Sequence, residues 1–361
     1  MPVSANVTPI SITSHRGGAG YAPENTMGAF QRSIDVGVAQ WVDFDVQRSK
    51  DGVLVVVHDL TLGRTSNVGE VFPDRARDRV GDFTLADLRR LDVGSWFRPA
   101  EFPGERIPTF SDALDFLAGR VGITFELKHP RLYPGLENDV ADALRTHGLA
   151  DSDLVEIGSF EHDSLERMHA CLPTIAVSGA FRTASELEVS SITRVLSSVS
   201  FAPQHTSEQL ALADKLGLPV GVGMNSPQRM RRALSDGITR LSSDYPDVLA
   251  RVAARQPPFE LDEHVAVDDV AIDAESGIWT AAIRNVSTRQ VSVRGWYLWN
   301  GVATPIDRGG ATMAPGELRS VALDPPRARD VSSIRALALH DENNHLRTVH
   351  EYRAAPRPAS S

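Results

Sequence analysis

The sequence has almost no cysteine, because Cys171 is the single one among 361 residues. One cysteine excludes an intrachain disulfide, and one thiolate cannot form a cysteine-based metal site. The length, by contrast, is enough to bury a large core in one barrel-sized domain with a smaller domain beside it.

Positive charge is scarce relative to negative charge. Lys and Arg number 37 against 47 Asp and Glu, which gives a formal net charge of −10. Such a field repels nucleic acid and anionic membrane surfaces, so neither is expected as a partner. A local group of cations could still bind a phosphate.

Long hydrophobic runs are absent as well. No stretch approaches the length that is needed to cross a bilayer. The N-terminal segment "MPVSANVTPISITSHRGG" has no basic region followed by an apolar stretch, so no signal peptide is expected. Together these absences predict a cytoplasmic protein.

The first two thirds of the chain contain strand-like and helix-like segments in alternation. The predicted strands are 10–14, 41–46, 123–128, 154–159, 174–179, 195–202, 219–224 and 240–244. The predicted helices are 25–36, 111–119, 136–147, 162–170, 184–190, 206–216 and 227–236. Glu24 or Asn25, Ser111 and Ser226 are the expected N-caps of three of these helices. The alternation predicts an α/β protein with a (β/α)₈ barrel (TIM barrel). An open doubly wound sheet is the alternative, but no glycine-rich phosphate turn follows the first strand.

Two regions depart from this alternation. Residues 61–108, called the insertion below, contain glycine, proline and charges without a strand pattern, and are expected to cap the mouth of the barrel. From residue 258 the pattern changes to period two, with turn signals between the runs, which predicts a β-sandwich. The expected domains are therefore a barrel over 1–257 and a sandwich over 258–355, followed by a disordered tail over 356–361.

The stretch "WVDFDVQRSKDGVLVVVHDL", residues 41–60, places acidic and imidazole groups in strand-like runs. Asp-Gly between two apolar runs predicts a hairpin with a two-residue loop. That loop pairs Asp45 with His58 and Asp43 with Leu60, so the two carboxylates and the imidazole share one face. A solvated hairpin face is the alternative interpretation of the same pattern.

Two further strands end in polar residues, which favours a functional site over a solvated face. In "ITFELKHP", Glu126 and Lys128 share a face at the end of an apolar strand. In "SITSHRGG", His15 and Arg16 end the first strand. Buried charges need partners or a metal, and the three strands supply groups of both signs.

The residue types define a chemistry. The carboxylates of Asp43, Asp45 and Glu126 are hard oxygen ligands, which suit Mg²⁺ or Ca²⁺ better than zinc. Such a metal polarises a phosphoryl oxygen.

The remaining polar residues supply charge and proton transfer. Arg16 and Lys128 offer fixed positive charge for a phosphate, and His15 and His58 can act as general acid and base on opposite sides of a phosphorus atom. These groups, together with the metal, predict a phosphodiesterase site.

Four segments resemble the motifs of the glycerophosphodiester phosphodiesterase family in order and spacing. They are "SHRGGAGYAPENT", "DFDVQRSKDGVLVVVHD", "FELKHPRLYPGLE" and "SSDYPD". The resemblance covers about residues 10–250 and includes the family's insertion. It implies a (β/α)₈ barrel that hydrolyses glycerophosphodiesters to an alcohol and glycerol 3-phosphate with a divalent metal.

Carried over by position, the resemblance assigns the same roles as the residue chemistry. His15 and His58 become the acid/base pair, in either order, and Arg16 and Lys128 become phosphate contacts. The implied metal ligands are Asp43, Asp45 and Glu126.

The sequence also departs from the family pattern. The family usually has Glu at the position of Asp43, and Gln at the position of Gly158. Its aromatic-containing motif near the seventh strand is "GVGMN" here, with Gly221 and Gly223. The last two changes remove bulk near the expected pocket, so they bear on which head group the enzyme accepts.

Several other residues have two interpretations. Phe160 packs either against substrate or in the core, and Trp96 in the insertion either closes over the ligand or packs locally. His129 and Tyr133 either reach the pocket or shape the loop. Two further assignments concern acidic residues: Asp59 is expected to orient His58 or the hairpin backbone rather than bind metal, and Asp244 to anchor the last strand.

The C-terminal region resembles a lamin-tail type of immunoglobulin-like sandwich through "NVS", "GW" and "PGE". Analogy suggests a role in protein contacts or oligomerisation. Two rival functions compete with a metal-dependent glycerophosphodiesterase, namely a lyase of the sphingomyelinase D type that forms cyclic phosphates and a non-catalytic binding module. The single cysteine and the insertion favour the glycerophosphodiesterase over the lyase, and the presence of all the charged positions, apart from the exchange of Glu for Asp43, disfavours a binding module.

Overall fold

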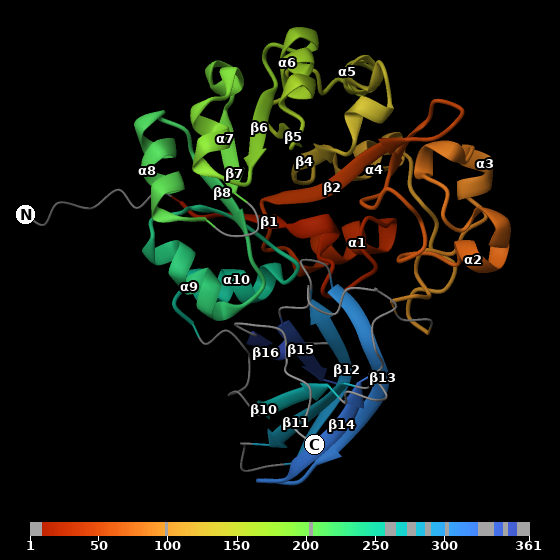
Figure 1. Ribbon diagram of the computed structural model, residues 1–361, viewed down its shortest axis with the longest axis vertical. Coiled ribbons are helices and arrows are strands. Elements are labelled where there is room, and N and C mark those ends of the chain that lie inside the picture. Colours follow the sequence, from red (N-terminus) through yellow and green to blue (C-terminus); the bar gives the residue numbers. More distant parts are fainter. Residues whose placement is uncertain are drawn as a thin grey trace, which may run out of the picture.

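The computed structural model describes residues 9–97, 100–201, 205–256, 265–272, 279–285, 290–299, 303–323, 336–341 and 346–351. Eight parallel strands within these residues close into a barrel, because β1 pairs with both β2 and β9 (Figure 1). In order around the barrel they are β1 (Ser11–Ser14), β2 (Trp41–Arg48), β4 (Gly122–Leu127), β5 (Val155–Ser159), β6 (Ala176–Phe181), β7 (Ser198–Phe201), β8 (Val220–Gly223) and β9 (Arg240–Ser243). The predicted (β/α)₈ barrel is confirmed.

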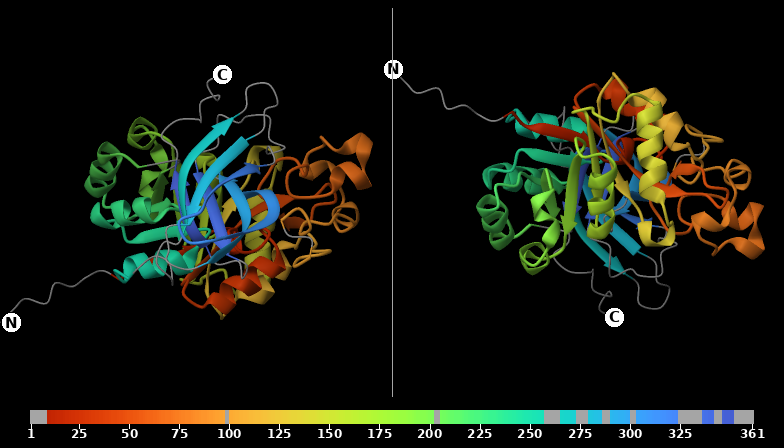
Figure 2. Two further views of the ribbon diagram at one scale, coloured as in Figure 1. Left: turned by 90° about the horizontal axis from the view of Figure 1, so that it is seen from below. Right: turned by 90° about the horizontal axis from the view of Figure 1, so that it is seen from above.

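Helices surround the barrel and cover its outer surface (Figures 1 and 2). They are α1 (Met27–Val36), α4 (Phe110–Leu117), α5 (Leu136–Thr146), α6 (His162–Cys171), α7 (Ala184–Glu188), α8 (Ser207–Lys215), α9 (Pro227–Ser235) and α10 (Pro246–Ala253). The sequence predicted all of these except α10, whose start is marked by Pro246 at the first helical position. None of the helices in the described part of the chain is long and apolar enough to span a bilayer.

Two of the predicted helix caps are wrong. The backbone N–H of Ala29 donates to Thr26 Oγ1 at 3.1 Å, so Thr26, and neither Glu24 nor Asn25, caps α1. In the same way Thr109 caps α4 in place of Ser111, whereas the Ser226 cap of α9 is confirmed. Glu24 and Asn25 are therefore free for another role.

Successive side chains of β2 point alternately into the hydrophobic core and toward the candidate site. Val42, Phe44 and Val46 are fully buried under the helices, where Phe44 stacks on Phe125 with 5.6 Å between ring centroids. Because successive side chains of a strand point to opposite faces, Asp43 and Asp45 lie on the other face, toward the barrel interior.

The insertion forms a compact unit beside the barrel, with α2 (Val68–Val71) and α3 (Leu85–Leu88) (Figure 1). It holds no strand at its described positions, as predicted. Its apolar side chains form a second core, made of Leu62, Val68, Val80, Phe83, Leu88, Leu91, Val93 and Ile107, which packs on Val55 and Val57 of the hairpin segment. This core fixes the insertion against the hairpin that carries His58.

The C-terminal strands pair into two antiparallel sheets. One contains β10 (Val265–Ile272), β11 (Trp279–Asn285) and β14 (Leu318–Leu323). The other contains β12 (Val291–Trp299), β13 (Ala303–Met313), β15 (Ala336–Asp341) and β16 (Leu346–Glu351). The lamin-tail likeness stays a prediction, and the proposed 257/258 boundary and the tail lie outside the described residues.

Candidate active site

The hairpin register differs from the predicted one by a single residue. β3 (Leu54–Val56) pairs antiparallel with β2, and Val46 lies opposite Val56. The turn has three residues, because Ser49 N–H donates to the Val53 carbonyl at 2.8 Å and Gly52 adopts φ +87°. A three-residue loop that ends in a left-handed glycine is a common alternative to the two-residue loop. Asp45 therefore does not lie opposite His58, and that prediction is wrong.

His58 still reaches the site because it lies beyond the end of β3. Its Nδ1 lies 2.6 Å from Asp59 Oδ1, as expected for a carboxylate that orients an imidazole. Burial raises the pKa of Asp45. The charges of Lys128 and His58 are the leading causes that outweigh burial, so the pKa of Asp45 lies well below its usual range. His58 is thus within electrostatic reach of Asp45.

His15 follows β1 and has a matching carboxylate partner. Its Nδ1 lies 2.6 Å from Asp244 Oδ1, while its Nε2 lies 3.9 Å from Asp43 Oδ2. Burial lowers the pKa of His15, but the carboxylates of Asp244 and Asp43 outweigh burial and raise the pKa above its ordinary value. Asp244 thus does more than anchor the last strand, since it holds one nitrogen of His15 and leaves the other facing Asp43.

The carboxylates and cations of β2, β4 and the segment after β1 form a network of alternating charges. Lys128 Nζ lies 2.9 Å from Glu126 Oε2 and 3.4 Å from Asp45 Oδ1. Arg16 Nε lies 3.3 Å from Asp45 Oδ2. Lys128 is the more exposed of the two cations, with 12% of its side chain exposed against 6% for Arg16. Lys128 is therefore better placed to reach a bound phosphate.

Among the carboxylates of the site, Asp43 is the one whose negative charge is least offset by nearby positive charge. Burial, together with the charges of Asp45 and Glu126, raises its pKa to about 7, against the opposing effect of His15 and Arg16. Among the described residues, no group of three His, Cys, Asp or Glu side chains is arranged so that it could hold a metal ion. The donor chemistry of Asp43, Asp45 and Glu126 nevertheless fits a hard cation, because all three are carboxylates and a cation would offset the repulsion that raises the pKa of Asp43.

Glu24 and Arg64 connect the two sides of the site, and the sequence did not indicate this. Arg64 donates to both carboxylate oxygens of Glu24, at 2.7 and 2.8 Å, and to Asp59 Oδ2 at 2.6 Å. Glu24 also accepts from Arg16 at 3.0 Å. The insertion therefore supplies Arg64 to the carboxylate that holds His58. Arg64 lies in a segment without periodicity, so no sequence pattern could have identified it.

Asn25 holds Asp45 through two hydrogen bonds. Its side-chain N–H donates to Asp45 Oδ2 at 2.8 Å, and its Oδ1 accepts from the Asp45 backbone at 3.2 Å. Asn25, Arg16 and His129 adopt left-handed backbone angles, with φ of 60°, 50° and 50°. Such angles cost non-glycine residues about 1–3 kcal/mol each and cluster at functional sites.

The Glu24 ion pairs predict a specific acid sensitivity. Burial raises the pKa of Glu24, but Arg64 and Arg16 overcome this effect and hold the pKa at about 2, below its ordinary value of 4.5. A depressed native pKa contributes stability that is complete above pH 4.5 and is lost as the pH falls through about 2. Glu24→Gln is therefore expected to lower the free energy of unfolding at pH 7 by about 3 kcal/mol.

Urea unfolding at pH 7 and near pH 2 measures this effect. The wild type is expected to approach the variant in stability at the lower pH. Glu161→Gln is the matched control, because its partner Arg131 is 75% exposed and exposed pairs contribute less than about 1 kcal/mol. Equal losses in the two variants at pH 7 would contradict the buried network.

The two aromatic candidates have different surroundings. The guanidinium of Arg64 lies 6.0 Å from the ring centre of Trp96, and the Trp96 indole N–H donates to the Val93 carbonyl at 2.7 Å. Trp96 thus borders the charge network. Phe160 instead lies under Arg182, 4.6 Å from its ring centre, with no contact to the charge network among those described. A substrate contact by either ring stays a prediction.

The glycines that replace family residues leave room at the barrel rim. Gly158 lies beside Glu126 in the sheet, and a Cβ on it would meet nothing closer than 3.7 Å. A Cβ on Gly221 would likewise meet nothing closer than 3.8 Å, and on Gly223 nothing within 4 Å. Steric need does not explain these glycines, which agrees with the predicted loss of bulk.

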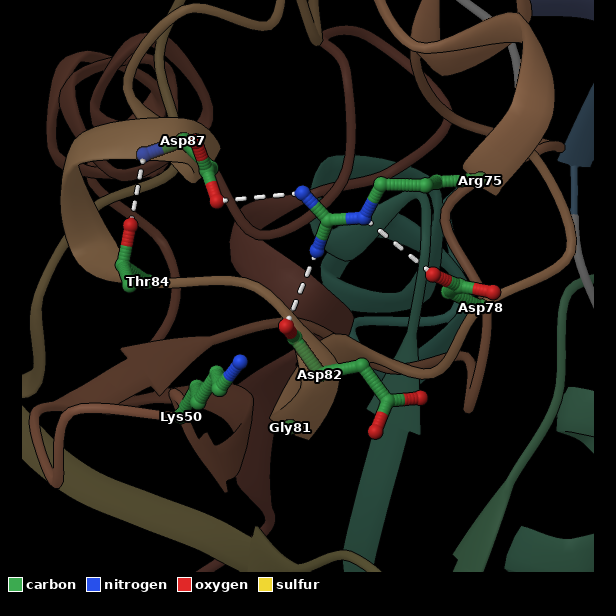
Figure 3. Close-up of a pocket in the computed structure, with 7 residues that line it drawn as sticks. All are labelled: Lys50, Arg75, Asp78, Gly81, Asp82, Thr84 and Asp87. Atoms are coloured by element: carbon green, nitrogen blue, oxygen red, sulfur yellow. Dashed lines mark hydrogen bonds and ion pairs between the residues drawn. The ribbon is translucent and has the colours of Figure 1, made fainter.

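A separate pocket on the insertion is not the active site. Its walls are formed by Lys50, Arg75, Asp78, Gly81, Asp82, Thr84 and Asp87 (Figure 3). The Arg75 guanidinium donates to Asp78 and Asp87 at 3.2 Å each and to the Asp82 carbonyl at 2.9 Å. Arg75 also lies over the Phe83 ring, 4.0 Å from its centre. Its charge is thus used within the insertion, where it supports the packing.

Comparison with known proteins agrees with this geometry. Residues 15–248 match the model of the glycerophosphoryl diester phosphodiesterase family. A glycerophosphodiester phosphodiesterase of Bacillus subtilis is 30% identical over 261 residues, which are 67% of this chain and 86% of the relative.

Solved structures agree as well. A glycerophosphodiester phosphodiesterase from Agrobacterium tumefaciens has a TM-score of 0.56 at 27% identity and covers 67% of this chain and 99% of its own. A phosphodiesterase from Oleispira antarctica in complex with the product sn-glycerol-3-phosphate has a TM-score of 0.59 at 25% identity, over 68% of this chain and 96% of its own. The chain is therefore an enzyme that belongs to the glycerophosphoryl diester phosphodiesterase family.

Proposed function

We propose that this protein hydrolyses glycerophosphodiesters to an alcohol and sn-glycerol 3-phosphate by acid/base catalysis from His15 and His58. The observation that carries the proposal is the pair of imidazoles, each with a carboxylate 2.6 Å from its Nδ1. Each also interacts with a carboxylate of β2, because His15 Nε2 lies 3.9 Å from Asp43 and His58 acts electrostatically on Asp45. The product in the Oleispira antarctica relative supports the same substrate class.

The mechanism follows from the free nitrogen of each imidazole. Because Asp244 and Asp59 occupy the Nδ1 atoms, each Nε2 is left to exchange a proton with substrate. One histidine takes the proton from the attacking oxygen and the other gives a proton to the departing alcohol. The two pairs are chemically alike, so both assignments of acid and base fit them. The attacking oxygen is either water or a vicinal hydroxyl of the glycerol, which would give a cyclic phosphate that water then opens.

The cations bind and orient the phosphate. Lys128, the more exposed of the two cations, contacts a phosphoryl oxygen, and Arg16 holds the carboxylates of Asp45 and Glu24. Arg64 and Glu24 keep the insertion in place beside Asp59. The glycines at positions 158, 221 and 223 leave room for the head group of the departing alcohol.

A divalent cation, Mg²⁺ or Ca²⁺, is part of this proposal. Asp43, Asp45 and Glu126 would hold it, and when bound it would polarise a phosphoryl oxygen. Removal of the metal with EDTA is expected to lower the rate by about 10²-fold or more, because a metal contributes several kcal/mol of charge stabilisation. The measurement is sn-glycerol 3-phosphate release after chelation and after titration with each ion. Full activity in EDTA would contradict the metal.

A substrate panel tests the function itself. Glycerophosphocholine, -ethanolamine, -glycerol and -inositol and lysophospholipids are each incubated with the enzyme and either ion, and products are followed by phosphorus NMR. Release of sn-glycerol 3-phosphate from at least one diester is expected. A cyclic phosphate that persists would indicate a lyase, and no turnover of any diester would indicate a binding module.

A further inference from the structure

The observed hairpin register raises a question about His58. Opposed residues share a face, and Val46 lies opposite Val56. In an unbroken strand His58 would thus follow Leu54 and Val56 onto the helix-covered face, away from Asp45. Both of those side chains are buried in that core. Something must turn the chain after Val56 so that the imidazole faces the site.

Gln47 is the residue that does this. Its side-chain nitrogen lies 3.0, 3.3 and 2.8 Å from the carbonyl oxygens of Val57, His58 and Asp59. Three consecutive carbonyls can converge on one nitrogen only if the chain curls around it, which ends the strand at this point. Gln47 itself is completely buried, so water cannot replace these hydrogen bonds.

Tyr133 fixes the other end of the same amide. Its hydroxyl donates to Gln47 Oε1 at 3.0 Å, which determines the orientation of the amide group. The ring packs against Gly81 of the insertion, where a Cβ would come within 2.7 Å of it. Burial raises the pKa of Tyr133 to about 12, so the hydroxyl keeps its proton at the pH of any assay.

We propose that Gln47, held by Tyr133, is a positioning residue that sets the place of His58 for catalysis. The proposal rests on the catalytic role of His58 given above. Gln47 lies two residues beyond Asp45 on β2, and Tyr133 follows the strand that carries Glu126, so this one buried amide ties the His58 segment to both strands of acidic residues. A displacement of about 1 Å at a reacting group can cost about 10²-fold in rate.

Two substitutions test the proposal. Gln47→Met keeps the length of the side chain and removes its hydrogen bonds, and is expected to lower kcat by about 10-fold to 10²-fold with KM changed less than about 2-fold. Tyr133→Phe removes the hydroxyl but keeps the packing of the ring, and is expected to lower kcat by about 3-fold to 10-fold. This second variant tests the proposal even if Gln47→Met fails to fold.

A double-mutant cycle separates positioning from general stability. If Gln47 acts through His58, Gln47→Met causes no further loss of kcat in a His58→Ala background. An equal fractional loss in both backgrounds would overturn the proposal. Normal activity of His58→Ala alone would instead refute the proposed function, so the two failures are distinguishable.

The matched control is Gln40→Met. Gln40 also bonds to backbone groups, accepting from Ile12 at 2.7 Å and donating to Val38 at 3.0 Å, but it precedes β2 at the other end of the barrel. It is expected to leave kcat unchanged. A loss of kcat in Gln40→Met as large as in Gln47→Met would also overturn the proposal.

Discussion

Replacement of His15 or His58 by alanine is expected to lower kcat for glycerophosphodiester hydrolysis by about 10²-fold or more in each case. A positioned general acid or base contributes about 10² to 10⁴ in rate, and each histidine has its own orienting carboxylate at 2.6 Å. KM is expected to change little, because Lys128 still supplies the charge that binds phosphate. Steady-state kinetics over the full substrate range measure both constants.

A peripheral His–Asp pair provides the control for this prediction. His147 Nε2 lies 3.4 Å from Asp115 Oδ1, at the C-terminal end of α5. That end leads into the start of β5, whereas the site residues lie at the opposite ends of the strands, so His147→Ala is expected to leave kcat unchanged. Activity within about 2-fold of wild type in His15→Ala or His58→Ala would remove that residue from the mechanism.

The barrel could be predicted because its signals are local. Each strand is a short apolar run bounded by turn residues, and each of the predicted helices follows a strand. On β2 the same alternation that buries Val42, Phe44 and Val46 assigns Asp43 and Asp45 to the other face. Acidic residues on an apolar strand are not a sufficient signal by themselves, because Glu156 on β5 pairs with Ser198 and Arg240 instead of the site residues. What singled out Asp43 and Asp45 was the occurrence of further polar groups at the ends of two other strands.

The partners themselves depend on long-range geometry that no local pattern encodes. Asp244 contacts His15 across 229 positions, and Arg64 reaches Glu24 from a segment without periodicity. The hairpin register failed for another reason. "KDG" fits both a two-residue and a three-residue loop, and the buried Gln47 amide favours the three-residue loop by holding the carbonyls that follow β3.

Asp244→Asn is expected to lower kcat by about 10²-fold to 10⁴-fold. Asp244 Oδ1 holds His15 Nδ1 at 2.6 Å, and Oδ2 accepts from Asn225 at 2.7 Å. An asparagine offers one oxygen and one NH₂ group, so it cannot accept from both partners at once. Loss of the carboxylate that orients a catalytic imidazole has this magnitude in hydrolases with a comparable His–Asp pair. The fold should persist, because the Asp244 backbone still donates to Asn225 Oδ1 at 2.8 Å.

The pH profile distinguishes orientation of His15 from simple anchoring of β9. The negative charge of Asp244 helps to hold the pKa of His15 above its ordinary value, so its removal lowers that pKa. The limb of the kcat profile that belongs to His15 should therefore move to lower pH. Asp247→Asn is the matched control. Asp247 lies in α10, the helix that follows β9, and accepts from the Tyr21 hydroxyl at 2.6 Å. If both variants lose the same activity and neither profile moves, Asp244 serves only the strand, and the orienting role of its carboxylate is refuted.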